Sequence, residues 1–141
     1  MSTFPKSPKE AVGGLTYFPR MLDKIRRKAS GELGPEYQKN LGKPLSGDGA
    51  LTNFLRVDYA NLCERVLQGG TDEEILEWCF EKGRRLNEGD IRIWNGFITR
   101  LGWRDFAAAR LEQGKKEHGI ADRADIATMG DLIDYEEGRL I

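Results

Sequence analysis

The sequence contains few of the side chains from which metal centres and disulfide frameworks are built. Its 141 residues include one histidine, His118, and two cysteines, Cys63 and Cys79. Neither cysteine has a second Cys or His beside it at metal-ligand spacing, so we expect no metal site and no cofactor. Both cysteines fall on the apolar side of an expected helix. We predict two reduced, buried thiols, with a structural disulfide as the alternative.

A single histidine also cannot supply a two-histidine metal site. His118 falls in the last turn of an expected helix, where a protonated ring suits the negative end of the helix dipole, and we interpret it as structural. A metal site made of carboxylates alone stays open in principle. We interpret the acids near the C-terminus as a solvated face, which comprises Asp131, Asp134, Glu136 and Glu137.

Long hydrophobic runs are missing as well. No apolar segment approaches the roughly 18 residues that cross a bilayer, and residues 1–10 lack the apolar stretch of a secretory signal. Hydrophobic residues make up 39% and charged residues 32% of the chain, which are proportions typical of a water-soluble globular protein. We therefore expect a cytoplasmic protein with one domain, residues 1–141, and no membrane contact.

Charge is close to balanced overall but unevenly distributed. The net charge is −1, yet residues 1–43 hold nine Lys or Arg against four Asp or Glu, a net of +5, which leaves −6 for residues 44–141. The acidic remainder argues against a dedicated nucleic-acid-binding protein. The basic first third either forms a local anion site or docks onto the acidic remainder.

The sequence does contain several segments in which apolar residues recur at helical spacing, and a glycine follows most of them. No alternating strand pattern is present. The sequence predicts an all-α fold, a compact bundle of about five main helices with short helical turns. The main helices are expected from Pro19 to Ser30, Tyr59 to Gln68, Thr71 to Gly83, Glu88 to Leu101 and Asp105 to His118, with a short last helix capped by Thr128.

Two segments lack this periodicity. Residues 1–16 are expected to run extended over the surface. Residues 31–49 are rich in glycine and proline and are expected to form a long loop with one helical turn near Glu36. A loop of that length in a compact domain is more often functional than idle.

A first group of candidate binding residues lies at the start of the first expected helix. It comprises Tyr17, Arg20, Asp23 and Lys24. The preceding pair Gly13–Gly14 lets a backbone approach a ligand closely, and free amides at a helix start attract anions. The alternative is that these cations form salt bridges within the chain, with Asp23 and Arg27 paired at i,i+4.

A second group, Trp103, Arg104 and Asp105, follows the glycine that ends the fourth main helix. An aromatic wall beside an arginine can hold a planar or anionic ligand. The alternative is that the tryptophans serve as core residues.

Three segments are distinctive, namely residues 13–26 (GGLTYFPRMLDKIR), 69–80 (GGTDEEILEWCF) and 102–105 (GWRD). Together they resemble a bacterial family of small helical proteins that is classed as a domain of unknown function. The resemblance spans nearly the whole chain. It implies one helical domain and no particular activity.

These observations favour a non-enzymatic domain that binds a small anionic ligand or a protein partner. The alternative is an enzyme that acts on a small anionic metabolite, with Asp23 or Asp105 as the base and Arg20 or Arg104 holding the substrate. A nucleic-acid module ranks third because the basic segment is short. A cleft with an acid beside both arginines would favour the enzyme, whereas a flat apolar patch would favour the partner surface.

Overall fold

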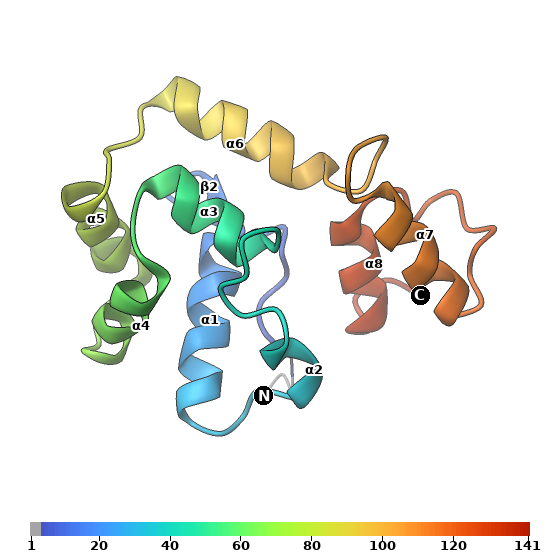
Figure 1. The fold of residues 1–141 in the computed structure, drawn as a ribbon, viewed down its shortest axis with the longest axis horizontal. Coiled ribbons are helices and arrows are strands. Elements are labelled where there is room, and N and C mark those ends of the chain that lie inside the picture. Colours follow the sequence, from blue (N-terminus) through green and yellow to red (C-terminus); the bar gives the residue numbers. More distant parts are fainter. Residues whose placement is uncertain (1–3) are drawn as a thin grey trace.

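The computed structural model describes residues 4–141, which form helices grouped around a central first helix (Figure 1). The all-α class is confirmed, since the described residues add only one hairpin of two very short strands. In chain order the elements are β1 (Ala11–Val12), β2 (Leu15–Thr16), α1 (Phe18–Ala29), α2 (Pro35–Gln38), α3 (Gly47–Leu55), α4 (Tyr59–Leu67), α5 (Asp72–Lys82), α6 (Glu88–Arg100), α7 (Ala108–Glu117) and α8 (Met129–Glu136).

Side-chain caps fix the helix starts close to where the sequence predicts them. At α5, Thr71 Oγ1 accepts from Glu74 N at 3.1 Å and Glu74 Oε1 accepts from Thr71 N at 3.0 Å, which together form a capping box. Asn87 and Asp90 form a second box at α6. Such caps satisfy amides that no helical carbonyl can reach.

Helix α3 lies partly inside the segment expected to be a loop, so the end of that loop was wrongly placed. Its first turn contains Gly47 and Gly49, which are poor helix formers. The Ser46 side chain nevertheless caps the helix, accepting from Gly49 N at 3.3 Å. Leu51 and Leu55, four residues apart, are fully buried, and that spacing was the signal available in the sequence.

The glycine pair 13–14 forms the turn of the hairpin. Gly13 and Gly14 have φ of 56° and 81°, the left-handed values that a two-residue hairpin turn needs, and Val12 pairs with Leu15. Residues 11–16 are therefore folded back, whereas the sequence predicted an extended run. Asn95 of α6 holds the turn, because its side chain donates to Gly14 O at 2.7 Å and accepts from Thr16 N at 3.0 Å.

The main apolar core surrounds α1. Phe18, Met21 and Leu22 are fully buried in it, together with residues of α3, α4 and α5. Trp94 of α6 is 3% exposed and donates from Nε1 to Thr16 O at 2.8 Å, so it is a core residue. Trp78 of α5 is half-buried at the rim of this core.

A second, smaller apolar cluster joins α7, α8 and the segment between them. Its buried members are Leu111, Ile120, Ile126 and Leu132. His118 lies at the end of α7, where its Nε2 is 2.8 Å from Glu136 Oε2. Helices α7 and α8 stand at the right of Figure 1, across α1 from α4 and α5.

Both cysteines are free, as predicted, with Cys79 buried and Cys63 half-buried. In the described part of the chain no helix is long and apolar enough to cross a membrane. Residues 4–141 also contain no group of three or more His, Cys, Asp or Glu side chains placed to hold a metal ion.

Candidate functional site

Two of the candidate residues at the start of α1, Arg20 and Lys24, each form a buried ion pair. Arg20 is 4% exposed. Its guanidinium donates to both carboxylate oxygens of Glu137, at 3.0 and 2.9 Å, and to the carbonyl of Lys6 at 3.0 Å. This bidentate pair joins the first third of the chain to its C-terminal end.

Glu137 is surrounded by further donors. The Tyr37 hydroxyl donates to it at 2.9 Å, and Arg139 also donates to it. Burial works to raise the pKa of Glu137, but hydrogen bonding and charge from Arg20, helped by Arg139 and Tyr37, hold that pKa below its ordinary value. The carboxylate is therefore an ionised member of a buried network.

Lys24 and Tyr17 meet a second buried acid, Asp48. Lys24 Nζ is 2.9 Å from Asp48 Oδ1 and donates to the Tyr17 hydroxyl at 3.0 Å, while that hydroxyl donates to Asp48 at 2.8 Å. Asp48 is fully buried. Burial lowers the pKa of Lys24, and the charge of Asp48 opposes that shift. These bonds also hold Tyr17 at φ 80°, a conformation that non-glycine residues rarely adopt.

Asp23 accepts one hydrogen bond from the N-terminal segment and one from its own helix. It accepts from the backbone N of Lys6 at 2.9 Å and from Arg27 Nε at 3.2 Å. The second contact is the i,i+4 pair that the sequence analysis gave as an alternative.

Acids from the rest of the chain thus meet the cations of α1. Glu137 and Asp48 pair with Arg20 and Lys24, and Asp72 of α5 lies 2.7 Å from Arg26. The basic first third is therefore docked on the acidic remainder. The interpretation of the C-terminal acids as a solvated face was wrong for Asp134 and Glu137, which are 6% and 7% exposed because they take part in this docking.

The second candidate group forms the turn between α6 and α7. Trp103 is 51% exposed, and the Arg104 guanidinium lies 5.0 Å from the centre of its ring. Asp105 clamps the turn, because its carboxylate accepts from Gly102 N at 3.0 Å and from Ala107 N at 2.9 Å. Arg104 has φ 54°, in the left-handed region. We call residues 102–105 the Trp103 turn.

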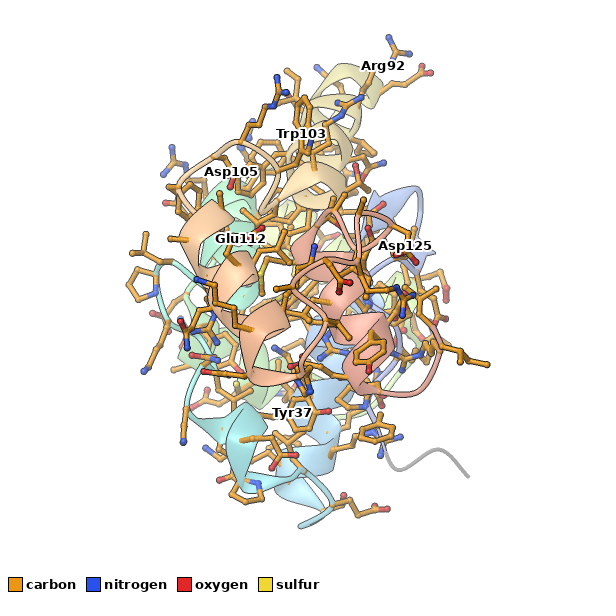
Figure 2. The ribbon with its side chains drawn as sticks, turned by 90° about the vertical axis from the view of Figure 1, so that its right-hand side faces the viewer. Tyr37, Arg92, Trp103, Asp105, Glu112 and Asp125 are labelled. Atoms are coloured by element: carbon orange, nitrogen blue, oxygen red, sulfur yellow. The ribbon has the colours of Figure 1, made fainter. Side chains whose placement is uncertain are left out.

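The two candidate groups lie in different parts of the molecule. Figure 2 places Trp103 and Asp105 near the upper end of the view, and Tyr37, which contacts the Arg20–Glu137 pair, near the lower end. Arg20 donates to Lys6 and Glu137 and lies over the ring of Tyr37. The structure therefore does not bring Arg20 and Arg104 together around one ligand.

Helix α6 adds a groove that the sequence analysis did not identify. It runs beside the hairpin and has a volume of about 560 Å³. Gly14 of the hairpin turn lines it together with seven residues of α6, namely Glu88, Ile91, Arg92, Asn95, Gly96, Thr99 and Arg100. Arg92 has an exposed partner, Glu88, at 3.8 Å. Among residues 4–141 no ion pair includes Arg100 or Arg104, so two of the cations on this edge are uncompensated.

Exposed apolar side chains gather along the same stretch of chain. Ile93 is 70% exposed, Phe97 37%, Trp103 51% and Phe106 64%. Residues 91–104 contain three arginines and no acid, and this run was the available sequence signal. We call α6 and the Trp103 turn, with Phe106, the α6 surface; it forms the upper edge of the molecule in Figure 1.

Residues 2–139 match the family described as Domain of unknown function (DUF5069). The match covers nearly the whole chain, as the resemblance noted in the sequence implies. No curated protein matches the chain.

Proposed function

The chain belongs to the DUF5069 family, and we propose that it is a non-enzymatic interaction domain that binds an acidic protein partner along the α6 surface. The family description assigns no activity, so the proposal rests on the surface itself. The observation that carries it is the combination of unpaired arginines with exposed apolar side chains between residues 91 and 106.

The arginines and the exposed apolar side chains both suit a protein partner. Four of the seven large hydrophobic side chains that are exposed in the described chain lie in this stretch, and clustered exposed apolar groups mark interaction sites. Aromatic residues and arginine are also the types enriched at protein interfaces. A segment that carries carboxylates and apolar side chains would neutralise the arginines and cover the rings.

The Trp103 turn is preorganised for such contact. Asp105 accepts two backbone hydrogen bonds across the turn, and Arg104 is held over the Trp103 ring. Side chains that are ordered before binding lose less entropy when a partner arrives. In this proposal Trp103 and Arg104 contact the partner, and Asp105 is a positioning residue.

The spacing of the arginines suggests the form of the partner. Arg92 and Arg100 are eight residues apart on α6, so they are separated by about 12 Å along the helix axis. An extended chain advances about 3.3 Å per residue. A partner lying extended in the groove beside Gly14 would therefore meet both arginines with carboxylates about four residues apart.

The other functions considered have weaker support. Arg20 and Lys24 would have to leave buried acids before they could bind a small anion, and we infer that they stabilise the fold instead. A catalytic base would need a carboxylate that faces a cleft, yet Asp23 and Asp105 accept hydrogen bonds from within the chain. Nucleic acid would satisfy the arginines but leave Ile93 and Phe97 without an apolar partner.

A designed peptide tests the proposal. Its extended sequence should carry two glutamates four residues apart with leucine and valine between them, and a version with lysine in place of glutamate is the control. We expect the acidic peptide to shift backbone NMR signals of α6 and the Trp103 turn. The double variant Arg100→Gln, Arg104→Gln should bind it at least tenfold more weakly, because it removes the arginine that meets one glutamate and the arginine of the Trp103 turn.

Lys116→Gln is the matched control variant, since Lys116 is an exposed cation on α7 away from the groove; it should bind normally. The proposal fails if the signals of α6 do not move, if the lysine peptide binds equally well, or if the double variant keeps its affinity. Tighter binding of a duplex DNA oligonucleotide than of the acidic peptide would assign the surface to nucleic acid instead.

A further inference from the structure

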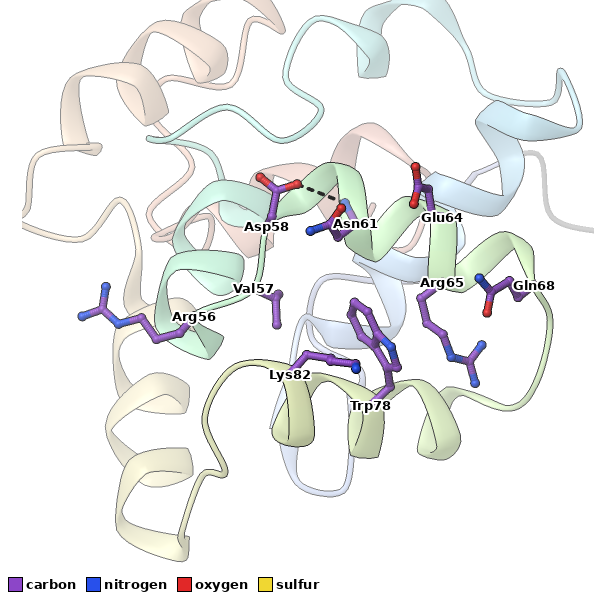
Figure 3. A pocket seen from close by; sticks show the side chains of 9 residues that line it. All are labelled: Arg56, Val57, Asp58, Asn61, Glu64, Arg65, Gln68, Trp78 and Lys82. Atoms are coloured by element: carbon purple, nitrogen blue, oxygen red, sulfur yellow. Dashed lines mark hydrogen bonds between the residues drawn. The ribbon is translucent and has the colours of Figure 1, made fainter.

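A groove of about 440 Å³ lies between α4 and α5, away from the α6 surface (Figure 3). This volume falls within the roughly 300–1,000 Å³ of pockets that hold small molecules. The side chains on its walls include an indole, three cations and two amides, namely Trp78, Arg56, Arg65, Lys82, Asn61 and Gln68.

The indole of Trp78 is available to a ligand. Figure 3 shows it rising from α5 toward α4, with Lys82 on one side and Arg65 on the other. Its inner part packs against the main core, and it is half-buried. No described residue accepts a hydrogen bond from Trp78 Nε1, whereas the buried Trp94 donates to Thr16 O. The ring therefore offers both a stacking surface and an unused donor.

The cations around the ring form no ion pair in the described chain, although the charge of Arg65 acts on Glu74. Among residues 4–141 no ion pair includes Arg56, Arg65 or Lys82. Arg65 donates to the carbonyl of Gly69 at 2.6 Å, a contact that orders its guanidinium without cancelling its charge. A flat ring between two cations suits a planar aromatic group that carries an anionic group at its edge.

The remaining polar groups narrow the class of ligand. Asp58 accepts from Asn61 N through Oδ2 at 3.1 Å, so its other oxygen can accept from a hydroxyl, and Glu64 lies on the same wall. A nucleotide requires four kinds of group, and this groove contains all of them: carboxylates that accept from hydroxyls, amides that pair with a base edge, an indole that stacks on the base, and cations that bind a phosphate. We propose that this groove binds a nucleoside monophosphate, stacked on Trp78 with its phosphate at Lys82.

AMP, adenosine and inorganic phosphate, titrated separately into the full chain, test this assignment. We expect AMP to shift the indole N–H resonance of Trp78 and to leave that of Trp94 in place; Trp78→Phe identifies the resonance by removing it. Lys82→Gln changes an exposed side chain and should weaken AMP binding about tenfold while leaving adenosine binding unchanged, because only the phosphate contact is lost.

Lys116→Gln and the double variant of Arg100 and Arg104 are controls that should bind AMP normally, so this test is independent of the partner surface. The assignment is overturned if millimolar AMP leaves the Trp78 resonance unmoved. It is also overturned if Lys82→Gln binds AMP as tightly as the parent protein, or if inorganic phosphate binds as well as AMP.

Discussion

Trp94 and Trp103 carry the same ring in opposite environments. Trp94 is 3% exposed and stacks on Phe54 with ring centroids 5.6 Å apart, whereas Trp103 is 51% exposed and contacts Arg104. We therefore infer that Trp94 stabilises the fold, and we propose that Trp103 contacts the partner. Trp94 lies within the fourth expected helix, whereas Trp103 follows the glycine that ends it, so the sequence already separated the two positions.

Replacement of each ring by alanine should therefore have unequal effects. We expect Trp94→Ala to lower the free energy of unfolding by about 3–5 kcal/mol, since it opens a cavity and leaves Thr16 O without its donor. Trp103→Ala should change it by less than about 1 kcal/mol. Urea unfolding of both variants measures the difference, and equal losses would contradict the helix faces described above.

The thiols give a second test at the level of single residues. Burial raises the pKa of Cys79 to about 12, and burial also raises the pKa of Cys63, with a hydrogen bond from Tyr59 opposing the shift. A thiol reagent at pH 8 should therefore react slowly with the native protein and count two thiols after denaturation. Cys63→Ser isolates Cys79, which should be the slower of the two. A fast Cys79 would contradict its burial.

At the scale of elements, α1 shows why the burial of its cationic side chains could not be predicted from the sequence. Its apolar stripe of Met21, Leu22 and Ile25 is buried as the periodicity predicts. Arg20 and Lys24 are buried as well, because their partners Glu137 and Asp48 come from distant segments. Helical spacing reports which side chains share a face, but it carries no information on which distant acid will meet them.

Limited trypsin digestion tests the docking of α1. Lys39 and Lys43 are exposed in the segment between α2 and α3, whereas Arg20 and Lys24 are buried. We expect the first cut after Lys39, with α1 spared, because cleavage needs a locally unfolded and exposed backbone. Lys43 precedes Pro44, and trypsin does not cut a Lys–Pro bond. Cleavage within α1 before the loop is cut would show that this helix is not held on the body.

The predictable elements were those with caps or with an apolar stripe. Thr71, Asn87 and Thr128 each begin a helix as expected, because capping is a local interaction. Helix α3 was missed because glycines at its start lower helix propensity, and the folded tertiary context overrides that preference. The Trp103 turn was found from three adjacent residues, but the α6 groove was not, since the hairpin that forms its other wall comes from far along the chain.

At the scale of the whole molecule, buried ion pairs connect the chain's beginning to its end. Glu137 is ionised in the folded state. Burial alone would raise its pKa, but the hydrogen bonds and charge of Arg20 hold that pKa below its ordinary value. The unfolded-state pKa of glutamate is about 4.3. The stabilisation from Glu137 is therefore complete above that pH and is lost as the pH falls through the lower folded-state pKa.

Unfolding by urea between pH 6 and pH 3 measures this linkage. The parent protein should lose stability steeply below about pH 4.3, and Glu137→Gln should show a shallower decline from a lower starting value. Glu112→Gln, at an exposed position on α7, should keep the parent slope. Identical slopes for Glu137→Gln and the parent would show that this carboxylate is not linked to folding.

The central claim is that α1 directs its cations inward for stability while the α6 surface directs its arginines outward to a partner. The free energy of unfolding of Arg20→Gln and Arg104→Gln, measured side by side in urea, tests it most directly. We expect Arg20→Gln to lose about 3 kcal/mol or more, because the buried Glu137 carboxylate loses its bidentate partner and keeps only Arg139 and Tyr37. Arg104→Gln should stay within about 0.5 kcal/mol of the parent. A stable Arg20→Gln protein, or a loss at Arg104 as large as at Arg20, would contradict the claim.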